Sequence, residues 1–253
     1  MLLRAIDTSS HQPADLTELI TRFGPGLVIV KLYQQIERIT PQGNSRMAQA
    51  HSRAQIASAL AAGVEVSGYM WLYADYAYVE DAVDQAIDLA ISSGLALPFL
   101  AIDVETYVDG SIPDAHMIAR AISQCVKRGV EPVIYWSREM WKRAGSPTDE
   151  VFNVYQWVAE YVDWIPEDLY DVTPVVGPYH LVVGHQYTSD PLDLSIFDAF
   201  WHEYSERTLV NLIEQAVQGI HAERFRRGSM RKKVVSSYLV DLETYLALLK
   251  EKL

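Results

Sequence analysis

The chain has 253 residues, of which 49% are hydrophobic and 21% charged, a balance typical of a globular protein with a large core. Its net charge of -12 is uneven: residues 1–197 carry 12 basic and 25 acidic groups, whereas residues 198–253 carry 9 basic and 8 acidic ones. Nucleic-acid phosphates need Lys and Arg to neutralise them. The acidic body therefore excludes nucleic acid as the main partner and favours a neutral or cationic substrate.

The N-terminus and the single cysteine indicate where the chain is made. Met1–Asp7 has too short an apolar run for a signal peptide, and no window approaches the ~20 apolar residues of a membrane span. Cys125 is the only cysteine, so an internal disulfide is excluded. Because it shares a helix face with Ile118 and Ile122, we expect a buried core thiol rather than a nucleophile. These features predict synthesis in the cytoplasm, without a signal peptide and without stable membrane insertion.

Eight short apolar runs predict β-strands, and helical patterns separate the first five of them. The runs are Leu2–Ile6, Leu27–Tyr33, Val64–Tyr73, Pro98–Val104, Pro132–Trp136, Phe152–Ala159, His180–Tyr187 and Leu192–Phe197. Each helical pattern ends at a glycine suited to a left-handed C-cap, namely Gly24, Gly63, Gly94 or Gly129. Alternation of strand and helix predicts right-handed βαβ units and a parallel sheet.

After the fifth strand the alternation stops. Only Arg138–Ala144 has the pattern of a short helix, and the last three strands follow with little helical sequence between them. We therefore predict an α/β fold, an incomplete TIM-like barrel closed by plain strands, over residues 1–198.

The tail, residues 199–253, has a different composition, because Gly and Pro nearly vanish. Two helices are predicted, roughly Glu203–Ile220 and Met230–Lys252, and the second carries an apolar stripe with heptad-like spacing. This α-helical extension is either a hairpin folded on the barrel or an element for self-association or partner docking through residues 203–252. The basic segments Arg224–Arg227 and Arg231–Lys233 are a solvated turn or a contact for an anionic wall polymer or membrane surface.

Four acids stand beside the predicted strands. Asp103 and Glu105 come at the end of the run Pro98–Ile102, and the side-chain period of two places them on one face. Asp7 and Asp193 follow runs of the same kind. If the strands lie parallel in one sheet or barrel, all four acids converge at the edge where such folds place their chemistry. That is a site for hydrolysing a glycosidic bond.

Glycoside hydrolysis needs a proton donor and a second group that supports the oxocarbenium ion, roles usually filled by two carboxyls. Two carboxylates ~6 Å apart at an effective dielectric of ~20 repel by roughly 2–3 kcal/mol, about two pKa units, so neighbours alone keep one of them protonated. We predict Glu105 as the acid, because its longer side chain reaches outward while the deeper Asp103 remains ionised. The alternative is that the pair are N-caps or solvated loop residues.

Six short segments of the chain carry recognisable motifs. They are Ala5–His11, Ala101–Glu105, Pro132–Tyr135, Gln156–Tyr161, Gln186–Ser189 and Leu192–Leu194. Over about residues 3–198 these segments resemble, in order and spacing, the motifs of family 25 glycoside hydrolases, the lysozyme-type muramidases common among phage endolysins. The third strand, Tyr69–Tyr73, and His185 depart from the family pattern, which affects the expected glycan contacts but removes no carboxylate.

The resemblance implies a (β/α)5(β)3 barrel that cleaves the β-1,4 bond between N-acetylmuramic acid and N-acetylglucosamine in bacterial peptidoglycan, with no metal or cofactor. It makes Glu105 the general acid/base. Asp103 would be the nucleophile or would orient the substrate acetamido group, and Asp7 and Asp193 would give electrostatic and hydrogen-bonding support. A phage lysis system would carry the protein to the cell wall.

Sugar rings lie against flat apolar surfaces, which aromatic side chains provide. Trp71, Tyr73, Tyr135, Trp157 and Tyr187 stand late in their predicted strands. Core packing is the alternative for all five. For Tyr135, Trp157 and Tyr187 the match to family motifs favours a role in the site.

Two rival functions remain open from the sequence. Clustered carboxylates suit Mg²⁺ or Ca²⁺, which would make the chain a metal-dependent barrel hydrolase. A non-catalytic wall-binding or virion structural module would keep the barrel without turnover, although the retained Glu105 and Asp103 argue against it. No His-Glu-x-x-His, Gly-x-Ser-x-Gly, Walker or Gly-x-Gly-x-x-Gly motif is present.

Overall fold

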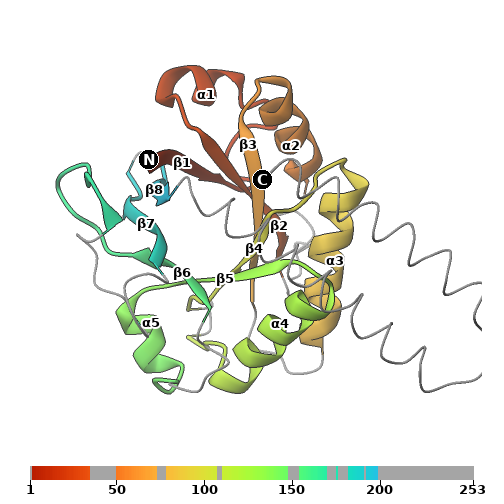
Figure 1. The fold of residues 1–253 in the computed structure, drawn as a ribbon, viewed down its shortest axis with the longest axis vertical. Coiled ribbons are helices and arrows are strands. Elements are labelled where there is room, and N and C mark those ends of the chain that lie inside the picture. Colours follow the sequence, from red (N-terminus) through yellow and green to blue (C-terminus); the bar gives the residue numbers. More distant parts are fainter. Residues whose placement is uncertain are drawn as a thin grey trace, which may run out of the picture. The chain divides into compact units, whose positions relative to one another are not determined.

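The structure is a computed structural model that describes residues 2–34, 50–72, 78–106, 110–147, 154–169, 175, 182–190 and 192–198. Its strands close into one barrel in sequence order (Figure 1). They are β1 (Leu2–Thr8), β2 (Leu27–Gln34), β3 (Glu65–Trp71), β4 (Phe99–Asp103), β5 (Glu131–Trp136), β6 (Tyr155–Ala159), β7 (Val182–Thr188) and β8 (Leu194–Asp198). All eight predicted strands are confirmed.

Neighbouring strands from β1 to β7 pair in parallel, whereas β8 is antiparallel to both β7 and β1. The condition that all the strands lie parallel therefore does not hold for β8. The reason is the short connection from β7, since a parallel pair needs a crossover of a dozen or more residues. The chain reaches β8 after only five residues and turns back.

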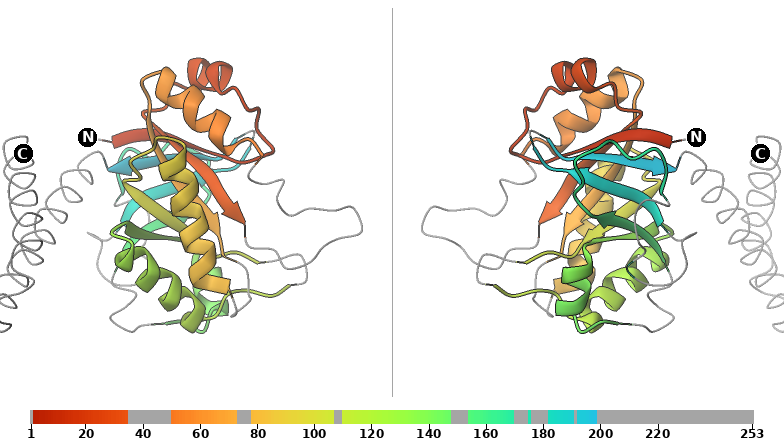
Figure 2. Two further views of the ribbon diagram at one scale, coloured as in Figure 1. Left: turned by 90° about the vertical axis from the view of Figure 1, so that its right-hand side faces the viewer. Right: turned by 90° about the vertical axis from the view of Figure 1, so that its left-hand side faces the viewer.

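Helices lie on the outside of the barrel and belong to the first five strands (Figures 1 and 2). They are α1 (Thr17–Phe23), α2 (Ser52–Ala61), α3 (Val79–Ser92), α4 (Ala115–Lys127) and α5 (Arg138–Arg143). The four predicted capping glycines all have positive φ, from 57° at Gly24 to 77° at Gly94. In the described part of the chain no helix separates β6, β7 and β8, which confirms the predicted barrel of five β/α units and three plain strands.

Side chains alternate along each strand, so that one half packs under the outer helices and the other half points into the barrel interior. In β2, Val28, Val30 and Leu32 point outward into the apolar layer under the helices, while Leu27, Ile29 and Lys31 point into the barrel. Cys125 is buried in the outer layer, as predicted, and burial raises the pKa of its thiol well above the ordinary value. The thiolate is therefore disfavoured.

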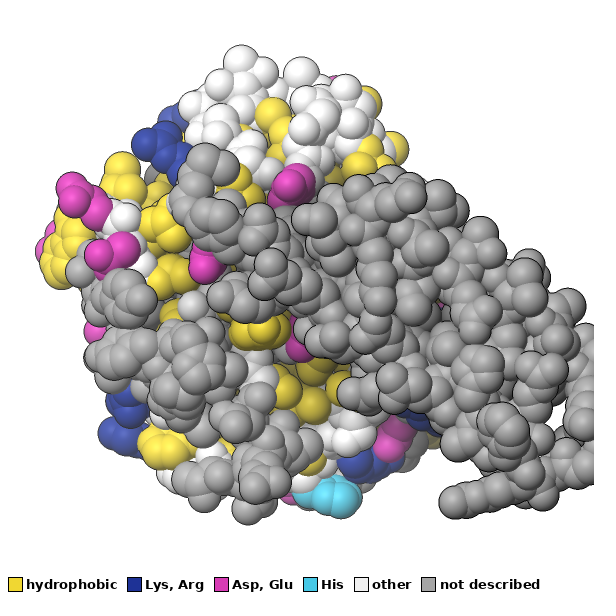
Figure 3. Space-filling view, viewed as in Figure 1, with side chains coloured by type: hydrophobic (Ala, Val, Ile, Leu, Met, Phe, Trp, Pro, Cys, Tyr) yellow, Lys and Arg dark blue, Asp and Glu magenta, His cyan; other side chains and the backbone are white. Residues whose placement is uncertain are grey.

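The described surface is mixed in character. On the face drawn in Figure 3, acidic side chains lie among hydrophobic ones, and basic side chains are seen near its edge. None of the helices in the described ranges is long and apolar enough to cross a membrane. The tail helices and basic segments predicted within residues 199–253 lie outside the described residues and stay predictions, as does the domain boundary at residue 198.

Candidate active site

The four predicted carboxyls meet in one cavity, which we call the carboxyl pocket. Its volume is about 230 Å³. It is lined by Asp7, Ser9, His11, Lys31, Tyr69, Trp71, Asp103, Glu105, Tyr135, Trp157, Tyr161, Gln186 and Asp193. These residues lie at the carboxyl ends of the parallel strands, the end at which barrels of this kind build their active sites.

Each carboxyl reaches the pocket through the strand beside it. Asp7 points inward near the end of β1, Asp103 ends β4, and Glu105 lies two residues further on. Asp193 comes from the opposite direction, because it precedes the antiparallel β8 instead of following a parallel strand. Its backbone carbonyl accepts a hydrogen bond from Asp7 N at 3.4 Å, which ties the two segments together.

The carboxyls differ in depth. Asp103 is 4% exposed and Asp7 8%, whereas Glu105 and Asp193 are half-buried. The structure thus agrees with the expectation that Glu105 reaches outward and Asp103 lies deeper. Asp103 Oδ1 is buried and has no hydrogen-bond partner among the described residues.

Burial is the largest electrostatic effect on this cluster. It raises the pKa of Asp7 and of Asp103 well above the ordinary value, and the negative charges of Asp193 and Glu105 raise them further. The pKa of Glu105 is also raised, first by burial and then by Asp193, while Lys31 and Tyr135 act against the rise. The predicted cause, repulsion between neighbours alone, is therefore wrong, because loss of water around the charge contributes more.

These directions also bear on which carboxyl holds the proton. The sequence predicted that Asp103 stays ionised beside a protonated Glu105, yet the pKa of Asp103 is itself raised well above the ordinary value. Carboxyls this close titrate as a set and share their protons. The raised pKa values favour the protonated forms in this cluster, and the division of roles between Asp103 and Glu105 stays a prediction.

A chain of hydrogen bonds crosses the pocket. The Tyr135 hydroxyl donates to Gln186 Oε1, and Gln186 Nε2 donates to Asp7 Oδ2 at 3.3 Å. The single hydroxyl hydrogen of Tyr135 can instead turn to Glu105, and its donation to that carboxyl acts to lower the pKa of Glu105. Tyr135 and Gln186 therefore connect the shallow acid to the deep one.

Aromatic rings form part of the pocket wall. Trp71, Tyr135 and Trp157 all line it, as predicted, and the ring centroids of Tyr135 and Trp157 are 4.5 Å apart. Trp157 Nε1 donates to Ser195 Oγ at 3.1 Å, which fixes the indole. Tyr161, in the loop after β6, lines the pocket while 60% of its surface is exposed. The pocket wall thus carries aromatic rings both in its buried part and at the exposed Tyr161, and a sugar ring could lie against them.

Two of the predicted aromatics are not placed in the pocket. Tyr187 does not line it, because the neighbouring Gln186 points inward and the strand period of two turns Tyr187 to the outer face. There its ring packs edge-on against His185, with centroids 6.4 Å apart. The prediction that Tyr187 lines the cleft is therefore wrong. Tyr73 lies outside the described residues.

Sequence reasoning missed several pocket residues, above all Lys31, Gln186 and Tyr161. For Lys31 a signal existed, because it is the charged residue of β2 and shares the inward alternation of Leu27 and Ile29. Gln186 and Tyr161 lie in the motif segments Gln186–Ser189 and Gln156–Tyr161, from which the sequence predicted only Tyr187 and Trp157 as site residues. Period-two alternation applied to β7 would have chosen Gln186 over Tyr187.

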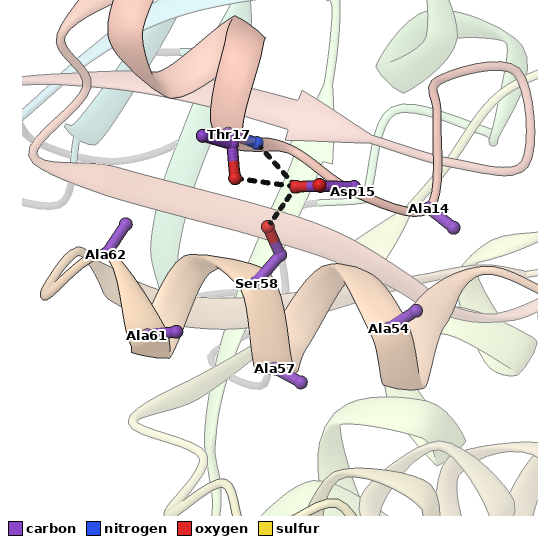
Figure 4. Close-up of a pocket in the computed structure, with 8 residues that line it drawn as sticks. All are labelled: Ala14, Asp15, Thr17, Ala54, Ala57, Ser58, Ala61 and Ala62. Atoms are coloured by element: carbon purple, nitrogen blue, oxygen red, sulfur yellow. Dashed lines mark hydrogen bonds between the residues drawn. The ribbon is translucent and has the colours of Figure 1, made fainter.

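A second hollow lies between α1 and α2, with a volume of about 630 Å³ (Figure 4). Most of its lining side chains are alanines. Its carboxylate, Asp15, accepts hydrogen bonds from Thr17 N, Thr17 Oγ1 and Ser58 Oγ at 2.9, 2.6 and 3.0 Å. The polar groups of this hollow are thus satisfied by one another, in contrast to Asp103 Oδ1 of the carboxyl pocket.

Comparison with solved structures identifies the fold. The catalytic domain of endolysin ply40 from bacteriophage P40 of Listeria monocytogenes matches 81% of this chain over 97% of its own length, with a TM-score of 0.59 and 16% identity. GHIP, a glycosyl hydrolase 25 of Streptococcus pneumoniae, matches 81% of this chain over 92% of its own, with a TM-score of 0.59 and 15% identity. The fold is that of the family 25 glycoside hydrolases.

A third match is the modular Cpl-1 endolysin, whose structure was determined with a peptidoglycan analogue. It covers 77% of this chain and 53% of its own length, with a TM-score of 0.56 and 18% identity. The resemblance predicted from the ordered motifs is thereby confirmed at the level of the fold. Among family profiles and among curated proteins the sequence finds no match.

Proposed function

We propose that this protein is a peptidoglycan hydrolase that cleaves the β-1,4 bond between N-acetylmuramic acid and N-acetylglucosamine. The observation that carries the proposal is the meeting of four carboxyls and several aromatic rings in one pocket at the carboxyl ends of the strands. A glycosidase needs both features, a protonated acid beside a second carboxyl and flat surfaces for the sugar. The fold shared with muramidases and endolysins agrees with this chemistry.

In this mechanism Glu105 is the general acid/base, because it lines the pocket and is less buried than Asp103 two residues before it. It protonates the leaving oxygen and then deprotonates the attacking water. Asp103 acts from below as the nucleophile, or orients the substrate acetamido group so that this group attacks. Asp7 and Asp193 support these two residues through their charges and hydrogen bonds.

The substrate and the place of action follow from the same proposal. Glycan strands of bacterial peptidoglycan would enter along Trp71, Tyr135, Trp157 and Tyr161, the aromatic residues of the pocket wall. The protein would act at the cell wall after release by a phage lysis system. Residues 1–198 would perform the cleavage, and residues 199–253 would be either a helical hairpin or an element for docking or self-association.

The test is release of reducing ends from purified cell walls, followed by mass spectrometry of the fragments. A muramic acid at the new reducing end is expected, and Glu105→Gln should lower the rate by about 10²–10⁴-fold, the usual contribution of a general acid. Asp81→Asn on the exposed surface of α3 is the matched control and should leave the rate unchanged. A reducing end on N-acetylglucosamine would contradict the proposed bond.

The same assay separates the two rivals. In the described part of the chain no group of three or more His, Cys, Asp or Glu side chains is placed to hold a metal ion. Activity that survives EDTA is therefore expected, and loss of activity with EDTA would instead favour a metal-dependent hydrolase. Sedimentation with walls of several chemotypes without release of reducing ends would favour the non-catalytic wall-binding module.

A further inference from the structure

Lys31 is the ammonium group of the carboxyl pocket, and its position is unusual for a lysine. It is 9% exposed and points into the barrel from β2, whereas lysine side chains normally keep their charge in water. The other inward residues of this strand, Leu27 and Ile29, are apolar and fully buried. An apolar side chain would fill the same space without the cost of a buried charge.

Aromatic rings hold the ammonium. Nζ lies 4.5 Å from the centroid of the Trp71 ring and 5.4 Å from that of Tyr69, both within the range of cation–π attraction. Within the described part of the chain the ion pairs join α3 to α4, and none of them involves Lys31. The charge of Lys31 is therefore not neutralised by one partner, and it acts on Asp7, Asp103 and Glu105 together.

The groups that this charge faces come from every wall of the pocket. They are Asp7 of β1, His11 of the loop after β1, Tyr69 of β3, Asp103 and Glu105 at the end of β4, Tyr135 of β5, Tyr161 after β6 and Asp193 before β8. The charge of Lys31 acts to lower the pKa of Asp7, Asp103 and Glu105, and their charges act to raise that of Lys31. Burial works in the opposite direction on all four.

In a site of buried acids without a cation, burial and mutual repulsion both favour the protonated form of the carboxyls. The reaction, however, needs one carboxyl that is protonated and one that is ionised. We propose that Lys31 is a positioning residue that supplies the missing positive charge, so that one member of the cluster is ionised beside a protonated neighbour. This inference rests on the proposed function for its role in turnover, but not for its effect on the carboxyls.

The consequence can be measured without turnover, by following the carboxyl carbons of Asp and Glu by NMR as the pH is varied. In Lys31→Met, which keeps the apolar stem, the midpoints of Asp103 and Glu105 should move up by about one pH unit, because the positive charge that lowers both is removed. Lys31→Arg keeps the charge and should restore them. Unchanged midpoints in Lys31→Met, or equal midpoints in the Met and Arg variants, would overturn the inference.

Turnover gives the second readout. The pH profile of reducing-end release should move to higher pH in Lys31→Met, because both the ionised and the protonated carboxyl titrate later, and Lys31→Arg should move it back. If the wild-type protein releases no reducing ends, the proposed function fails and the NMR titration still decides the role of Lys31. Lys31→Gln, a neutral polar variant, replaces Lys31→Met in both measurements if the latter does not fold.

Discussion

The two ends of the barrel interior are built from the same strands and have opposite characters. At the carboxyl ends the inward residues are charged or polar, and Asp103 Oδ1 is buried without a partner among the described residues. At the other end Phe99 and Phe197 stack with centroids 6.0 Å apart, and the ring of Phe197 fills the space beside Gly184. Asp103 and Phe99 are inward residues of one strand, four positions apart.

The difference shows how such a barrel divides its tasks. The Phe99 end is packed as tightly as a core and contributes stability. The Asp103 end places charges where water is scarce, which costs stability and provides perturbed carboxyls. Substitutions at the two ends should therefore have opposite effects: loss of activity with a gain in stability at one, and loss of stability at the other.

The largest effect is expected for Asp103→Asn. Removal of this carboxyl takes away the nucleophile or the group that orients the acetamido group, so the rate of reducing-end release should fall by about 10³-fold, equal to about 4 kcal/mol of activation free energy. Asp81→Asn on α3 is the control for the same chemical change on the surface. A fall of less than about tenfold would mean that Asp103 is not part of the reaction.

The second-largest effect is expected at the packed end of the barrel, where Phe99 and Phe197 stack, and Gly184→Ala tests it. A Cβ on Gly184 would lie 2.5 Å from a carbon of the Phe197 ring, so the ring or the strand must move. We expect a loss of about 1–3 kcal/mol in the free energy of unfolding, measured with urea. Phe197→Leu in the same chain should recover part of this loss. Equal stability of Gly184→Ala and the wild type would show that the packed end is looser than described.

The pH dependence of stability is the third test. Because the pKa of Asp103 is raised in the folded state, its favourable contribution is fully present below the unfolded pKa of about 3.9 and is lost as the pH rises through the folded value. Asp103→Asn removes this loss. The variant should match the wild type near pH 3.5 and be more stable than it at pH 8, measured by urea unfolding. A difference that does not change with pH would contradict the assigned burial.

Much of this arrangement could be predicted from the sequence, because its physical signals are local. Apolar runs and capping glycines fix the strands and helices, and a carboxyl at a strand end reaches the pocket whichever neighbours it has. The antiparallel direction of β8 needed a different signal, the length of a connection. The predicted runs end at Tyr187 and resume at Leu192, too close for a parallel crossover, and the antiparallel strand still brings Asp193 to the same edge.

The electrostatics were harder to predict, because they depend on depth. Repulsion between Asp103 and Glu105 can be estimated from spacing alone, but desolvation depends on how many atoms surround each group, which only the packed structure provides. The ammonium of Lys31 likewise became part of the site only when β2 and β3 placed it against Trp71. Motif matching also favoured Tyr187 although strand alternation excludes it from the pocket.

The smallest expected effect separates these two tyrosines. Tyr135 donates its one hydroxyl hydrogen to Gln186 or to Glu105, so Tyr135→Phe should lower the rate of reducing-end release by about tenfold, close to 1.4 kcal/mol for one lost hydrogen bond. Tyr187→Phe is the matched control on the outer face of β7 and should change the rate by less than about twofold. If Tyr187→Phe were the more damaging of the two, the outward orientation of Tyr187 would be wrong and the register of β7 would have to shift by one residue, since a slip of that size exchanges the two faces of a strand.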